Sequence, residues 1–179
     1  MGTPAQPPKP PMRAKERSEA EALSVGPDLG LRSTSFAPQE RIPSRYTADG
    51  DNRPPALTWN TPPKKTQALA LLCEDPDAPT PSPFVHWLVS DIDPARVDRM
   101  LWEGASSIPG AVQGKTSFGR VGYGGPEPPR GHGTHHYHFH LYALDARLRL
   151  EEGFSKKDLL QKMKDHVLAS GELIGTYSR

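Results

Sequence analysis

Hydrophobic residues in this chain gather in three runs that are typical of buried strands. They lie at 68–73, at 84–92 and at 135–144, and their lengths and flanking turn residues favour strands over helices. In the third run apolar side chains alternate with histidines, so we expect one face of that strand to pack into the core. Further short strands are expected within 29–42, at 56–59 and at 173–177.

A single helix is expected near the C-terminus. Ser155 is a suitable N-cap, and apolar residues follow it at Leu159, Met163 and Val167, which is the spacing of one helix face. Gly171 lies where such a helix would stop.

The composition favours the same fold class. The chain has 179 residues, of which 21 are Pro and 16 are Gly, and this is typical of many turns, short strands and little helix. We therefore predict a mainly β fold, a sandwich or barrel-like single domain with one C-terminal helix. The domain is placed at 25–179. A disordered arm rich in Pro and charge is expected at 1–24, and its functional alternative is a ligand for an SH3-like partner.

Charge and cysteine content argue against several classes of protein. The formal net charge is +1 and there is one Cys, so we expect no nucleic acid partner, no disulfide framework and no Cys-rich zinc site. No apolar run approaches the roughly 20 residues of a transmembrane helix. Residues 1–12 contain no apolar signal region, and a cytoplasmic location is therefore expected.

Two catalytic classes lack their motifs. The segment 110–116 resembles a phosphate-binding loop, but it is one residue short and Pro109 stands where its first glycine is needed. The sequence contains no G-x-S-x-G elbow, which argues against a serine hydrolase of that type.

Histidines are the most informative polar residues. Five of the seven lie between 132 and 140. His136, His138 and His140 alternate on one strand face at a spacing of about 7 Å, which allows imidazoles to share a metal ion. A metal-dependent hydrolase or oxygenase is therefore one alternative. We favour incidental imidazoles on a solvent-exposed face, because no carboxylate follows at a spacing that completes the ligand set.

A second group of polar residues lies close to the apolar runs. Asp75 and Asp77 follow the first run between prolines, and His86 lies inside the second. An unpaired buried imidazole is costly, so we expect Asp75 to be the partner of His86. His135 and Tyr137 point to the apolar face of their strand and can project two donors into one pocket. Ordinary hydrogen bonding of core side chains is the alternative.

Several motifs occur together and in order. They are DGDNxxPxLxW at 49–59, DPDAP at 75–79, HW at 86–87, GYGGPEPPRG at 122–131, HxYxFxLYAL at 135–144 and GELIGTYSR at 171–179. Together they resemble the phosphatidylethanolamine-binding protein family, whose animal members include the Raf kinase inhibitor protein. The bacterial-type branch is the more similar one, and the resemblance covers residues 29–179.

The resemblance implies a β domain with a small pocket for an anion. Its ligands would be phosphate, phosphoethanolamine or an acetate-like ion, held by hydroxyl, imidazole and loop amide donors. Carried over by motif, six residues would line the pocket: Asp75, His86, Tyr123, Pro129, His135 and Tyr137. Loop amides near Gly125 and Glu127 would add further donors, which makes eight predicted ligand-binding residues. The implied function is that of a non-catalytic binding and regulatory protein that needs no cofactor.

The resemblance also bears on protein partners. A kinase or a protease is the partner class that it implies, and the bacterial-type branch suggests a homodimer. A protein inhibitor that acts by surface contact, independently of the pocket, is the alternative. Replacement of Asp75 or His86 would then leave the inhibition intact.

Overall fold

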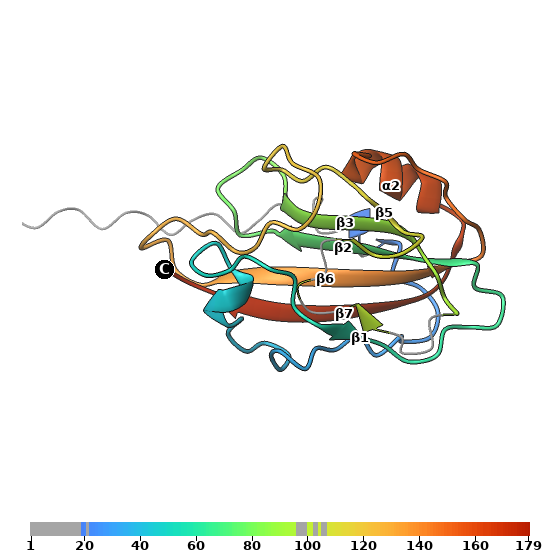
Figure 1. Cartoon of the computed structure of the whole chain (residues 1–179), viewed down its shortest axis with the longest axis horizontal. Coiled ribbons are helices and arrows are strands. Elements are labelled where there is room, and N and C mark those ends of the chain that lie inside the picture. Colours follow the sequence, from blue (N-terminus) through green and yellow to red (C-terminus); the bar gives the residue numbers. More distant parts are fainter. Residues whose placement is uncertain (1–18, 21, 96–99, 102–103, 105–106) are drawn as a thin grey trace, which may run out of the picture.

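The computed structural model describes residues 19, 20, 22–95, 100, 101, 104 and 107–179. Its centre is an antiparallel five-stranded sheet in the order β5-β3-β2-β6-β7 (Figure 1). The strands of this sheet are β2 (Ala68–Asp75), β3 (Phe84–Ile92), β5 (Val112–Gln113), β6 (His135–Leu144) and β7 (Val167–Tyr177). The other elements are β1 (Leu57–Thr58), β4 (Met100–Leu101), the 3₁₀ helix η1 (Ser44–Tyr46) and the helix α2 (Lys156–Met163).

The predicted fold class is confirmed: the protein is mostly β, and α2 is the helix near the C-terminus. The three apolar runs form β2, β3 and β6, the adjacent strands at the centre of the large sheet. β6 is flanked by β2 and β7, and it is hydrogen-bonded to both along its length. A side chain on β6 therefore has a cross-strand neighbour on either side, which determines the surroundings of every histidine in this strand.

The two faces of the large sheet carry separate cores. On one face Tyr137, Phe139 and Leu141 of β6 pack against residues from the N-terminal half of the chain, among them Ile42 and Trp59. The predicted inward face of the strand is therefore confirmed. On the other face the core contains residues of α2 together with the following side chains of the sheet: Ala70, Leu72, Leu88, Tyr142 and Leu144.

The segment 29–42 does not form the expected strands. It makes isolated bridges, such as Arg32 to Thr58 and Arg41 to Thr176, while Leu29 and Ile42 are buried in the first core. An apolar residue that packs over a sheet from an irregular segment gives the same local signal as a short strand, which is why the pattern was misleading here.

The helix begins as predicted but ends earlier. Ser155 accepts from the backbone of Asp158, whose side chain accepts from the backbone of Ser155, and this reciprocal pair is a capping box. α2 ends at Met163, and β7 begins at Val167. Val167 is therefore not part of the helix. Gly171 lies within β7 rather than at a helix stop, so the expected strand at 173–177 begins earlier than predicted.

The predicted arm at 1–24 lies mostly outside the described residues. Within its described part, Ala20 is buried against the second core, and its carbonyl accepts a hydrogen bond from the Tyr142 hydroxyl at 3.0 Å. Contacts with the sheet thus begin before residue 25. No helix among the described residues is long and apolar enough to cross a membrane.

Candidate functional site

Three polar residues at the N-terminal start of β6 form a hydrogen-bonded chain: Asp75, His135 and His132. Asp75 Oδ2 lies 2.6 Å from His135 Nδ1, and His135 Nε2 lies 2.6 Å from His132 Nδ1. The Asp75 and His135 side chains are 4% and 1% exposed, whereas His132 is exposed. The chain therefore connects a buried carboxylate with the protein surface through two imidazoles.

His86 does not pair with Asp75 as expected. Its Nδ1 donates to the carbonyl oxygen of Gly124 at 2.6 Å, and Asp75 is hydrogen-bonded to His135 instead. Asp75 also accepts from the backbone N–H of Asp77 at 2.8 Å, which fixes the turn after β2. The buried imidazole of His86 thus donates its hydrogen bond to the segment 122–131, which is rich in Gly and Pro and is called the Gly/Pro loop below.

A β-bulge places His86 beside Tyr137. The register of β2 and β3 shifts between Cys73–Trp87 and Glu74–Val85, so His86 is an extra residue without a partner in β2. Bulges turn a side chain away from the regular alternation and are common near functional sites. The rings of His86 and Tyr137 meet edge to face, with their centroids 5.1 Å apart.

Aromatic rings enclose the rest of the His86 imidazole. Phe84 and Phe118 lie 5.1 Å and 5.4 Å from it, centroid to centroid, and His86 is 4% exposed. This burial lowers the pKa of His86, while the Gly124 carbonyl and the charge of Asp75 act in the opposite direction. The imidazole is therefore biased toward its neutral form.

Tyr137 brings a polar atom without a partner to the same place. The residue is 1% exposed, and its hydroxyl oxygen is buried without a hydrogen bond. Burial raises the pKa of the Tyr137 hydroxyl, so the group is a neutral O–H donor at physiological pH. Buried hydroxyls are nearly always hydrogen-bonded, and an unsatisfied one calls for an explanation.

Other predicted site residues face a different segment. The Tyr123 hydroxyl donates to the Tyr46 carbonyl at 2.6 Å, and the Gly125 N–H donates to Asn52 Oδ1 at 2.8 Å. A Cβ at Gly125 would lie 2.3 Å from the Tyr46 carbonyl oxygen, so only glycine allows this close approach. Both residues therefore fix the Gly/Pro loop against 46–52, and the Gly125 amide is already engaged.

The remaining two predicted residues lie at the outside. Glu127 and Pro129 are both exposed. The Pro129 carbonyl accepts from the backbone N–H of His132 at 3.1 Å, in the turn that brings His132 to His135. Of the eight residues inferred by motif, the structure thus brings Asp75, His86, His135 and Tyr137 together and places the others in the surrounding loop or at its surface.

Residues that sequence reasoning did not assign complete this end of the sheet. Asp49 accepts from the Tyr177 hydroxyl at 2.6 Å and from two nitrogens of Arg179 at 2.6 Å and 3.0 Å. Hydrogen bonds from Arg179 and Tyr177 lower the pKa of Asp49 to about 2. The motifs at 49–59 and 171–179 contain these residues, and their joint occurrence was the signal that could have identified the contact.

Residues 32–178 match the family model of the phosphatidylethanolamine-binding protein. The chain belongs to the phosphatidylethanolamine-binding protein family. It is similar to the UPF0098 protein of Methanothermobacter thermautotrophicus, with 43% identity over 153 residues that cover 84% of this chain and 99% of the relative. The UPF0098 protein of Aquifex aeolicus is 45% identical over 158 residues, which cover 86% of this chain and 91% of the relative.

Solved structures of phosphatidylethanolamine-binding protein homologues agree with this assignment. The putative homologue CT736 from Chlamydia trachomatis has a TM-score of 0.79 and 37% identity, covering 85% of this chain and 98% of its own. E. coli YbcL, described as a member of the mammalian family, has a TM-score of 0.78 and 30% identity, covering 85% of this chain and 99% of its own. The resemblance inferred from the motifs is confirmed.

One cavity lies away from the polar residues described above. It has a volume of about 990 Å³, next to α2. Apolar side chains such as Leu23, Val85 and Leu160 line it together with Lys156 and Lys164. None of the eight ligand-binding residues inferred from the family motifs lines this cavity. This cavity and the predicted ligand-binding residues are thus in separate places.

Proposed function

We propose that this member of the phosphatidylethanolamine-binding protein family is a non-catalytic binding and regulatory protein. Its ligand would be a phosphate or carboxylate group on a small molecule, held by His86 and Tyr137 beside the ring of His135. The observation that carries the proposal is the buried Tyr137 hydroxyl, which has no hydrogen-bond partner. An anion oxygen at this point would satisfy it.

The protonation state of His86 determines which hydrogen bond its ring can make with the proposed ligand. Nδ1 of His86 already donates to the Gly124 carbonyl, so the neutral imidazole has no proton on Nε2. An anion oxygen can accept from Nε2 only when the ring is protonated, or a protonated phosphate can donate to it. Either arrangement brings one additional proton to the contact, and we therefore expect the ligand to bind more tightly at lower pH.

Asp75 has a supporting role in this proposal. A carboxylate repels an anion, but Asp75 Oδ2 is engaged by His135 Nδ1 at 2.6 Å. The carboxylate thus orients the His135 ring, and its charge favours the protonated form of His86. An ammonium group on the ligand, as in phosphoethanolamine, would add an attraction to Asp75.

Calorimetric titration of the full chain with inorganic phosphate and with phosphoethanolamine tests the proposal. We expect Tyr137→Phe to weaken binding about 10- to 100-fold, since a hydrogen bond to a charged group contributes about 1.5–3 kcal/mol. His86→Ala should weaken it by about 1–3 kcal/mol. The matched control is Tyr142→Phe, the same change on the opposite face of β6, which should bind as the wild type does.

Equal affinities of the wild type, Tyr137→Phe and His86→Ala would contradict the proposed site. Tighter binding of phosphoethanolamine than of phosphate would indicate that the ammonium group is recognised too. Binding to a kinase or a protease stays a prediction, and so does the formation of a homodimer. An inhibitor that acts by surface contact would keep its inhibition in His86→Ala, whereas regulation through the pocket would lose it.

A further inference from the structure

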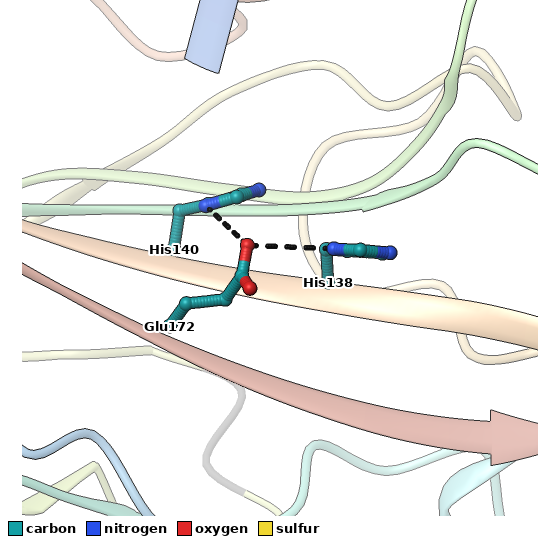
Figure 2. Close-up of side chains that lie close together, drawn as sticks. All are labelled: His138, His140 and Glu172. Atoms are coloured by element: carbon teal, nitrogen blue, oxygen red, sulfur yellow. Dashed lines mark hydrogen bonds and ion pairs between the residues drawn. The ribbon is translucent and has the colours of Figure 1, made fainter. Parts of the chain in front are cut away.

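The face of β6 opposite to the proposed pocket carries a cluster of metal-ligating side chains. His138 and His140 extend from β6, and Glu172 extends from the neighbouring strand β7, where it pairs directly with His140. Figure 2 shows the carboxylate between the two rings, with one oxygen facing a nitrogen of each. One ligand atom from each residue lies within 4.8 Å of the others.

The distances within this cluster are long for hydrogen bonds. Glu172 Oε2 lies 3.4 Å from His138 Nδ1 and 3.4 Å from His140 Nδ1, whereas N–H···O bonds are commonest at about 2.9–3.0 Å. Two ligand atoms on a tetrahedral zinc ion, each about 2.0–2.1 Å from the metal, lie about 3.3–3.4 Å apart. The observed separations therefore match two edges of a zinc coordination tetrahedron.

His140 provides a second, independent observation. It is 3% exposed, and its Nδ1 is a buried atom without a hydrogen-bond partner. The nearby Glu172 oxygen is close enough for an ion pair but does not make a hydrogen bond with this nitrogen. A metal ion at this nitrogen would satisfy it.

The charges around the cluster favour a cation. Glu74 on β2, the cross-strand neighbour of His138, pairs with Lys156 Nζ at 2.5 Å, and these two charges balance. The Glu172 carboxylate lies directly beside the two imidazoles, and its side chain is 40% exposed while that of His138 is 11% exposed. An ion can therefore approach from the Glu172 side and reach the buried His140 nitrogen.

We propose that Nδ1 of His138, Nδ1 of His140 and the Glu172 carboxylate bind a divalent first-row transition metal ion such as Zn²⁺. Two imidazoles and one carboxylate make a three-ligand set, which leaves a fourth position for water or for a group of a partner. The site would link β6 to β7 on the face that α2 partly covers. It is independent of the proposed anion pocket, which lies on the opposite face.

This set differs from the three-histidine site weighed from the sequence. His136 lies apart from it, because its Nδ1 pairs with Asp77 Oδ2 at 2.8 Å and its backbone N–H donates to the same oxygen. The carboxylate that the sequence pattern lacked is Glu172, which comes from the adjacent strand β7 rather than from a position close in sequence. His138 and His140 are buried, so the interpretation of imidazoles on a solvent-exposed face is wrong for these two.

Zinc titration of the full, metal-free chain by calorimetry tests the site. We expect one Zn²⁺ per chain and a loss of affinity of about tenfold or more in Glu172→Gln, which keeps the shape but removes the charged ligand. His138→Gln and His140→Gln should have the same effect. The matched control is His166→Gln, whose exposed imidazole pairs with Asp145 at 2.7 Å and should leave zinc binding unchanged.

A second measurement separates the site from misfolding and from other histidines. Glu172→Gln replaces a partly exposed side chain, and its circular dichroism should be that of the wild type. Nitrogen NMR of labelled imidazoles should show Nδ1 of His138 and His140 shifting on addition of Zn²⁺. Absence of stoichiometric zinc binding would overturn the proposal. Binding that survives Glu172→Gln but is lost in His132→Gln would overturn it as well.

Discussion

Asp75 Oδ2 and His135 Nδ1 lie 2.6 Å apart, and the two side chains are 4% and 1% exposed. This contact joins the last residue of β2 to the first residue of β6. A second imidazole–carboxylate pair, His166 with Asp145, has nearly the same separation of 2.7 Å, but its side chains are 44% and 42% exposed. The two pairs thus differ mainly in their contact with water.

Asp75→Asn is expected to destabilise the protein more than Asp145→Asn does. The first change weakens a buried charged hydrogen bond, which costs about 1–3 kcal/mol. The second changes an exposed pair, for which about 0–1 kcal/mol is typical. Urea unfolding followed by circular dichroism gives both free energies, and equal losses would show that burial does not strengthen the Asp75–His135 contact.

The free energy of unfolding is expected to fall as the pH drops below about 6.5. Burial lowers the pKa of His86 and of His140 in the folded protein. Between the unfolded value near 6.5 and the lower folded value, the unfolded chain therefore binds more protons and is favoured. Each imidazole contributes at most about 1.4 kcal/mol per pH unit.

Urea unfolding between pH 7.5 and 5.0, with a chelator present, measures this dependence. His86→Gln should flatten the curve, and His166→Gln should leave it as in the wild type. Asp49 and Asp77 have lowered pKa values and titrate below this range. A wild-type curve that is flat below pH 6.5 would refute the assignment.

Lys156→Met is expected to cost more stability than the double change Glu74→Gln with Lys156→Met. The single change leaves the carboxylate of Glu74, whose side chain is 7% exposed, without its ammonium partner. Burying an unpaired charge is expensive, and the double change removes that charge. We expect a coupling energy of about 1–3 kcal/mol in the double-mutant cycle.

The control for this cycle is Lys157→Met, a change at the next, exposed residue of α2. It should alter the free energy of unfolding by less than about 0.5 kcal/mol. Additive effects of the Glu74 and Lys156 changes would mean that the pair contributes nothing beyond its separate side chains.

Local patterns were sufficient to predict the central strands. β6 begins at His135 and ends at Leu144, as the alternation of aromatic and polar residues indicated. The helix start was equally local, because a capping box depends on residues three positions apart. The end of the helix could not be predicted from the local pattern. Val167 continues the helical spacing, but it pairs with Leu144 and belongs to β7.

The pairings within the site depend on register, which a single sequence does not display. His86 lies next to Tyr137 because a bulge inserts it into β3, and nothing in the local pattern marks that bulge. Glu172 meets His140 only through the alignment of β6 with β7. The family motifs predict a site that includes Asp75 and His86, but the hydrogen-bond partners of these two residues required the three-dimensional structure.

Successive side chains of β6 point to opposite faces of the sheet, so the two sites proposed above are separated by this strand. His135 and Tyr137 serve one side of the sheet, while His138 and His140 serve the other, and the peptide backbone stands between them. Substitutions can therefore tune either set of side chains while the other keeps its surroundings. A displacement of β6 by a single residue relative to β2 and β7 would exchange the two sets and abolish both at once.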